Sequence, residues 1–124
     1  MNRLDDGALD EVARYFSALA VPMRLKILNA LREGSRNVGE LTAATGCTQA
    51  NVSKHLAVLA QNGMVAKTPR GTSAYYHITD ARIFQLCDLV CGQIGRRYEE
   101  HAGRGRLFIV AAAPGKRRAA TGSR

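Results

Sequence analysis

The chain has 124 residues and carries 18 Lys and Arg against 10 Asp and Glu, a formal net charge of +8. Its hydrophobic fraction of 46% excludes disorder along most of the chain, and no apolar run approaches the roughly 20 residues of a membrane span. Three cysteines are too few for a secreted disulfide scaffold, so we expect a cytoplasmic protein with no membrane partner. The positive charge favours an anionic partner, with nucleic acid first.

The charge is unevenly distributed along the chain. Residues 1–95 hold ten basic and eight acidic side chains, whereas residues 96–124 hold eight basic and two acidic ones. We expect one domain over residues 1–105 and a flexible basic tail over residues 106–124. Because the tail holds most of the excess charge, only local patterns can show whether the folded part binds DNA.

The first two-thirds of the sequence predict four helices. Apolar residues at helical spacing indicate helices over residues 4–19, from 22 to just before 34, over 38–45, and from 49 to about 61. The residues that open or close these helices are Pro22, Gly34, Gly46, Thr48 and the pair Asn62-Gly63. In the first helix the apolar positions are Leu9, Val12, Phe16 and Leu19, and in the second they are Leu25, Ile27, Leu28 and Leu31.

After Gly63 the periodicity changes to that of strands. Residues 64–68 and 73–78 read as two strands joined by a turn over 69–72, and Thr79 or Asp80 then caps a long helix to about residue 98. The apolar stripe of this last helix comprises Ile83, Cys87, Val90, Cys91, Ile94 and Tyr98. The predicted fold is mostly α with a small β-hairpin wing, a winged helix–turn–helix in the order α-α-α-α-β-β-α.

Residues 38–56 have the order that a DNA-reading helix–turn–helix needs: a short helix, a tight turn at Gly46 and a capped second helix. The residues expected to pack the two helices together in the core are Leu41, Ala44, Val52, Leu56 and Leu59. Gln49, Ser53 and Lys54 lie off that stripe, where they can reach base edges or phosphates. The alternative is an amphipathic helix whose polar face is merely solvated and does not bind DNA, and the hairpin that follows makes this alternative less favoured.

The wing supplies a second candidate contact. Arg70 stands in the predicted turn, and the basic Lys67 is nearby. A cation at the tip of a hairpin is suited to a phosphate or a minor-groove contact.

The combined pattern resembles the ArsR/SmtB family of winged-helix bacterial repressors, many of which sense metals. The matching motifs are Pro22-x-Arg24-Leu25-x-Ile27-Leu28, Gly39-Glu40-Leu41, Thr48-Gln49-x-x-Val52-Ser53-x-His55-Leu56 and Tyr75-Tyr76-x-Ile78, and the resemblance covers about residues 8–100. It implies a homodimer through the first and last helices, double-stranded operator DNA as partner, and release by an inducer. The DNA contacts that it implies are Thr48, Gln49, Ser53, Lys54 and Arg70. His55 matches a common family residue that either touches a phosphate or buttresses the helix.

The metal-site and persulfide-sensing patterns of this family are not matched. Asn37 and Gly39 stand where a Cys-x-Cys motif would be, and Asn29 stands at the position of a persulfide-sensing cysteine. In the last helix Asp80 fits the first ligand position, but the remaining ligand positions hold Arg82, Gln93 and Arg96.

Cys87 and Cys91 remain as a candidate sensing pair. They are four residues apart and therefore share one helix face. Two thiolates on one face can chelate a thiophilic ion such as As(III), Cd(II) or Pb(II), and the dimer that the resemblance implies would bring up to four sulfurs near its axis. Thiol redox chemistry is a second use, and a purely structural role as small apolar residues is the third. Cys47, in the turn before Thr48, is an additional candidate thiol or a packed turn residue.

The leading hypothesis is therefore an inducible, sequence-specific transcriptional repressor. The alternatives are a thiol-redox-responsive repressor and a non-specific nucleic-acid-binding protein driven by the basic tail. An enzyme is not expected, because the histidines are scattered, no glycine-rich phosphate loop is present and Cys47 has no evident base.

Overall fold

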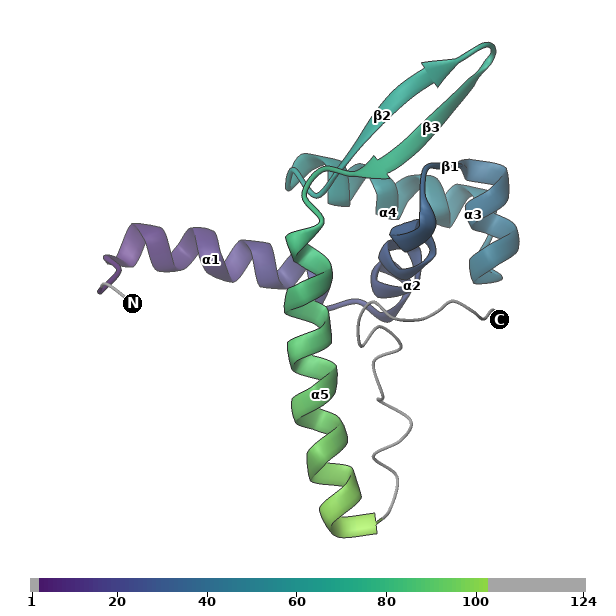
Figure 1. Ribbon diagram of the computed structural model, residues 1–124. Coiled ribbons are helices and arrows are strands. Elements are labelled where there is room, and N and C mark those ends of the chain that lie inside the picture. Colours follow the sequence, from purple (N-terminus) through teal and green to yellow (C-terminus); the bar gives the residue numbers. More distant parts are fainter. Residues whose placement is uncertain (1–2, 103–124) are drawn as a thin grey trace. The chain divides into compact units, whose positions relative to one another are not determined.

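The computed structural model describes residues 3–102, and the chain divides after Asp80 into two compact units. The first unit contains α1 (Asp6–Leu19), α2 (Pro22–Ala30), the 3₁₀ turn η1 (Leu31–Glu33), β1 (Arg36–Asn37), α3 (Val38–Thr45), α4 (Gln49–Gln61), β2 (Val65–Arg70) and β3 (Ser73–Ile78) (Figure 1). The described part of the second unit is α5 (Arg82–Ala102). The mostly helical fold with a hairpin wing is confirmed, whereas the basic tail predicted over 106–124 lies outside the described residues. The single domain expected over 1–105 stays a prediction.

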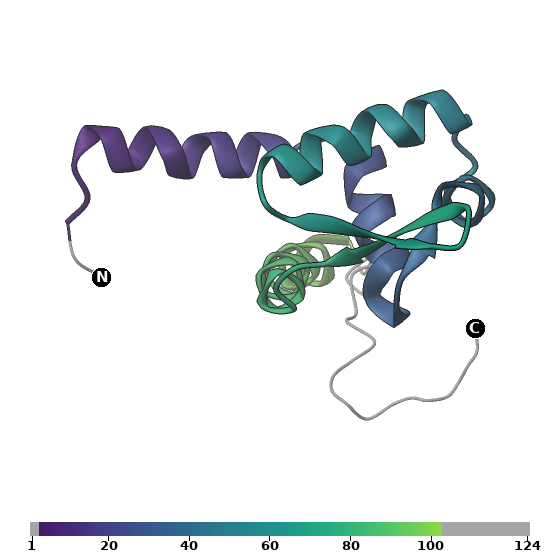
Figure 2. The ribbon, with the colours of Figure 1, turned by 90° about the horizontal axis from the view of Figure 1, so that it is seen from above.

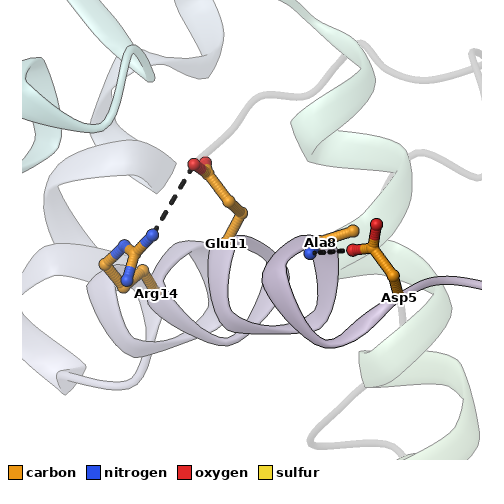
Figure 3. A network of polar contacts seen from close by, with 4 residues as sticks. All are labelled: Asp5, Ala8, Glu11 and Arg14. Carbon is orange, nitrogen blue, oxygen red and sulfur yellow. Dashed lines mark hydrogen bonds and ion pairs between the residues drawn. The ribbon is translucent and has the colours of Figure 1, made fainter.

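Helix boundaries follow the capping residues closely. Asp5 accepts a hydrogen bond from the backbone N–H of Ala8 at 2.8 Å and caps α1, whose surface also carries an ion pair between Glu11 and Arg14 at 3.6 Å (Figure 3). Thr48 caps α4 as predicted, because its hydroxyl accepts from the N–H of Asn51 at 3.2 Å. Each cap satisfies a backbone donor that has no partner inside its helix.

The two helices of the helix–turn–helix are joined at a glycine whose backbone adopts the left-handed conformation. Gly46 has a φ of 74°, a backbone region that L side chains rarely occupy, and its N–H donates to the carbonyl of Thr42 at 2.9 Å. This bond ends α3 at Thr45, and α4 begins at Gln49, three residues after Gly46. The boundaries predicted for both helices are confirmed.

The core of the first unit is an apolar seam contributed by α2, α3 and α4. Its six largest fully buried side chains are Ile27, Leu28, Leu41, Val52, Leu56 and Leu59. Burial of a leucine of this kind contributes roughly 2–3 kcal/mol. The seam fixes which face of α4 is buried and therefore which face is exposed.

One predicted core residue is wrong. Ala44 is exposed, and Thr45, one residue further along α3, is buried in its place at 6% exposure. Thr45 lies one helical turn after Leu41, so the two share a face, and its hydroxyl donates to the Leu41 carbonyl at 2.7 Å. Because that bond satisfies the hydroxyl, threonine can be buried there without the penalty of a lone polar group.

The wing is the outer part of a three-stranded antiparallel sheet in the order β1-β3-β2. The two-residue strand β1, which the sequence did not predict, pairs Arg36 with Tyr76 and Asn37 with Tyr75. The β2–β3 hairpin extends beyond the short strand β1 and twists along its length (Figures 1 and 2). Within the described residues, no helix is long and apolar enough to cross a membrane.

The turn of the hairpin is shorter than predicted. Pro69 and Arg70 belong to β2, where Pro69 pairs with Ala74 and Arg70 with Ser73, so that the connection is only Gly71-Thr72. Proline is tolerated because β2 is an edge strand. Gly71 adopts a φ of 61°, which this tight turn requires.

The start of the last helix also differs from the prediction. α5 begins at Arg82, so Thr79 and Asp80 precede its capping position. The hydroxyl of Thr79 instead donates to the carbonyl of Gly63 at 2.6 Å, and the Thr79 N–H donates to the carbonyl of Met64 at 3.1 Å. These bonds close the base of the wing.

Replacing Leu56 by alanine is expected to lower the free energy of unfolding by about 3 kcal/mol, because it opens a cavity in the seam beneath α4. Urea unfolding at a fixed protein concentration measures the effect. Gln61→Ala is the control, since that side chain lies on the same helix, is exposed, and its loss should cost little. Equal losses from the two substitutions would contradict the placement of the core.

Candidate DNA interface

The N-terminal half of α4 presents a polar face to solvent. Gln49, Ser53 and Lys54 are exposed, whereas Val52 and Leu56 on the same helix are fully buried. The sequence-predicted division of the helix into a buried and an open side is confirmed. Gln49 is the first residue of α4, where free backbone N–H groups add donors that suit a phosphate.

The turn that leads into α4 is held by side-chain bonds. The N–H of Cys47 donates to the hydroxyl of Thr45 at 3.3 Å, and Thr48 supplies the cap. Cys47 is half-buried, so its thiol is only partly accessible. Thr48 is exposed, which leaves its hydroxyl side open to a ligand beyond the cap.

His55 lies at the edge of the buried stripe of α4 and is half-buried. Partial burial, and then the positive charges of Arg24 on α2 and Lys54 on α4, lower the pKa of the His55 imidazole below its ordinary value of 6.5. The ring is therefore mostly neutral at pH 7. Arg24, which sequence reasoning had used only as a family motif, is thus part of the electrostatics of this surface. The sequence feature that could have indicated this role is the position of Arg24 in that motif, as the third residue of a helix that packs on α4.

The wing carries the second cationic element of this surface. Arg70 is exposed at the end of β2, and its guanidinium carbon lies 4.3 Å from the centroid of the Tyr75 ring. Lys67 on the same strand is also exposed, opposite Tyr76. Gln49, Ser53, Lys54 and Arg70 therefore all belong to one unit, and all face solvent. The contact between Arg70 and Tyr75 was not predicted, since it depends on the strand register.

The candidate sensing cysteines lie on α5. Cys87 and Cys91 are both half-buried, and neither is in a disulfide. Among the described residues, no group of three His, Cys, Asp or Glu side chains is placed to hold a metal ion. A thiophilic ion at this pair would therefore need a further ligand from outside the described part of one chain.

Comparison with known proteins places the chain in a family. The sequence model described as "Bacterial regulatory protein, arsR family" matches residues 22–67. The HTH-type transcriptional regulator NmtR of Mycobacterium tuberculosis is 41% identical over 85 residues, which cover 68% of this chain and 71% of that protein. A probable mercury resistance operon repressor of Streptomyces lividans is 38% identical over 77 residues, 62% of either chain.

Solved structures agree with this placement. The homodimeric winged helix-turn-helix DNA-binding domain of Mb0332 from Mycobacterium bovis, a possible ArsR-family regulator, has a TM-score of 0.69 and 34% identity over 82% of this chain and 97% of that one. The transcriptional repressor BigR of Xylella fastidiosa has a TM-score of 0.59 and 29% identity over 78% of this chain and 92% of that one. The chain therefore belongs to the arsR family of winged helix–turn–helix transcriptional repressors, which are DNA-binding regulators and not enzymes.

Proposed function

We propose that this protein is a homodimeric repressor that reads operator DNA with the N-terminal face of α4 and steadies it with the wing. The observation that carries the proposal is the exposed polar face of Gln49, Ser53 and Lys54, on a helix whose opposite side is fully buried. A glutamine at the start of such a helix can pair with adenine, and the lysine with guanine or a phosphate. Arg70 on the wing adds a phosphate or minor-groove contact.

Two apolar stripes support the dimer. On α1, Leu9, Val12 and Phe16 recur at helical spacing and are between 39% and 51% exposed. On α5, Val90 and Tyr98 are 47% and 41% exposed. Uncovered apolar stripes of this kind mark association surfaces, and a second copy of the chain is the proposed occupant. Two copies would present two α4 helices to a pseudo-palindromic site.

The inducer is proposed to act at Cys87 and Cys91. Both side chains share a face of α5, the helix that carries one of the two apolar stripes. A thiophilic ion such as As(III), Cd(II) or Pb(II), held by thiolates from both copies, would release DNA only if it bound one form of the dimer more tightly than the other. Oxidation of the same thiols is the alternative trigger.

Gln49→Ala should reduce discrimination between the chain's own promoter DNA and random DNA by about 1–3 kcal/mol, because it removes a base-edge contact. Lys54→Ala should weaken binding to both and lower the salt slope by about one. A gel shift at several salt concentrations measures both quantities. Gln61→Ala is the matched control, an exposed glutamine at the other end of α4. If both glutamine variants discriminate equally well, or if the wild type binds random DNA as tightly as the promoter, the basic tail and not α4 is the main determinant of DNA binding.

His55 should titrate below pH 6.5 in the free protein, and Arg24→Gln should raise its pKa, because one neighbouring positive charge is lost. Because the pKa of His55 is lower in the folded wild-type protein than in the unfolded chain, the unfolded chain binds more protons below pH 6.5. The free energy of unfolding should therefore fall as the pH drops through the window below 6.5. NMR titration of the imidazole C–H measures the pKa. A further rise on adding promoter DNA would identify a phosphate contact, and an unchanged pKa would identify a buttress. Titration at or above 6.5 in the free protein contradicts the electrostatic account.

Adding As(III) or Cd(II) should release the wild-type protein from promoter DNA, and Cys87→Ser or Cys91→Ser should raise the required concentration at least about tenfold, since a hydroxyl is a poor ligand for soft ions. Cys47→Ser is the matched control and should respond like the wild type. A parallel series with a mild oxidant separates redox sensing from ion binding. If both α5 variants release DNA as readily as the wild type, these thiols are structural.

A further inference from the structure

Arg70 stacks on the ring of Tyr75, and the hydroxyl of that tyrosine has a hydrogen-bond partner of its own. Its guanidinium carbon is 4.3 Å from the centroid of the Tyr75 ring, close enough for a cation–π stack. Arg70 pairs with Ser73 across the hairpin, so Tyr75 is its diagonal neighbour two residues along β3. A long side chain reaches such a diagonal position on one face of an antiparallel pair.

The Tyr75 ring is joined in turn to the start of α3. The side-chain amide of Asn37 donates to the Tyr75 hydroxyl at 3.3 Å, across the β1–β3 pair. The carbonyl oxygen of the same side chain accepts from the N–H of Glu40 at 2.8 Å, while the Asn37 N–H donates to the Glu40 carboxylate at 3.0 Å. Because a backbone N–H can only donate, this capping box fixes which end of the Asn37 amide faces Tyr75.

These contacts form a continuous polar path from the helix–turn–helix to the tip of the wing. It runs from α3 through Asn37 and Tyr75 to Arg70, over residues that are distant in sequence. α3 also packs against α4. An exposed arginine at the end of a hairpin would otherwise sample many rotamers. Stacking restricts it while leaving the in-plane N–H donors of the guanidinium available, since only a planar face meets the ring.

We infer that Tyr75 and Asn37 are positioning residues for Arg70, so that the wing meets the DNA backbone in a set register relative to α4. The inference rests on the proposed function, because it concerns the same DNA surface. It adds two residues that do not themselves touch DNA. Lysine at position 70 would keep the charge but lose the planar stack and the bidentate donor edge, so charge alone is not sufficient for this role.

The first test is made on the free full-length protein. NMR relaxation at Nε of Arg70 should report an ordered side chain in the wild type and a mobile one in Tyr75→Leu. Tyr75→Phe keeps the ring and loses the bond to Asn37, so it should lie between them. Tyr76→Leu, at the next position of β3, is the control and should leave Arg70 ordered. Equal mobility in wild type and Tyr75→Leu overturns the inference, whatever the protein does with DNA.

The second test is a double-mutant cycle on promoter DNA, by fluorescence anisotropy. Arg70→Ala should weaken binding about tenfold and lower the salt slope by about one, as for one lost phosphate contact. Tyr75→Leu should weaken binding several-fold in the wild type but have no further effect in the Arg70→Ala background, because its only contribution is through Arg70. Arg70→Lys should bind more weakly than the wild type while keeping the salt slope.

The outcomes of the cycle separate the two levels of the account. If wild type binds promoter and random DNA equally, the proposed function fails, and the positioning role fails with it. If wild type discriminates but Tyr75→Leu weakens binding equally in both backgrounds, only the positioning role fails. Thermal melts of every variant identify any that are unfolded. If Tyr75→Leu is unfolded, the conservative Tyr75→Phe variant replaces it in the cycle. A loss of binding that disappears in the Arg70→Ala background then supports the positioning role, and an equal loss in both backgrounds overturns it.

Discussion

The rotation of α4 about its own axis is the constraint on which the rest of this structure depends. Three of its side chains, Val52, Leu56 and Leu59, are fully buried, and together they form one stripe of the helix. Turning the helix by one residue position would expose this stripe and bury polar groups, at a cost of several kcal/mol. The exposed polar face is therefore set by the apolar one. The backbone of the recognition residues is already ordered before DNA binds, which lowers the entropy cost of binding.

A polar path complements this apolar seam. Asn37 is at once a strand residue of β1, the cap of α3 and the donor to Tyr75. The two-residue strand thus does more than extend the sheet: it joins the base of the wing to the helix that braces α4. The apolar seam sets the orientation of α4, and the role inferred for the polar path is to hold Arg70 in place on the wing. The basic tail adds charge, but nothing in its composition discriminates one DNA sequence from another.

Sequence reasoning succeeded where local chemistry decides the outcome. The bounds of α3 and α4 were predictable because Gly46, Thr48 and the Asn62-Gly63 pair punctuate the chain there. It failed where the answer depends on register or pairing. Two residues of β1 have no periodicity to detect, and the stack of Arg70 on Tyr75 depends on which residues face each other across the hairpin. The same holds for Pro69, which reads as a turn residue until β2 is known to be an edge strand.

The apolar stripes show another limit of local reasoning. Periodicity predicted α1 and α5 correctly as helices, but only Leu19 of the four predicted apolar positions on α1 is buried. A helical stripe indicates that a face is to be covered and does not identify what covers it. The choice of a second copy comes from the uncovered stripes of two helices together with a homodimeric relative. The inducer is even harder to predict from the sequence, because two half-buried thiols are equally compatible with ion binding, oxidation or packing.

A hydroxyl-radical footprint of the full-length protein on its own promoter DNA tests the central claim most directly, because it maps where α4 and the wing meet the duplex. A dimer reading DNA with α4 predicts two protected segments whose centres are one helical turn, about 10 base pairs, or a whole multiple of it apart. Flanking protection assigned to the wing should disappear in Arg70→Ala, while the two central segments remain. Uniform protection along the fragment, unchanged by that substitution, would contradict the account and indicate binding by charge alone.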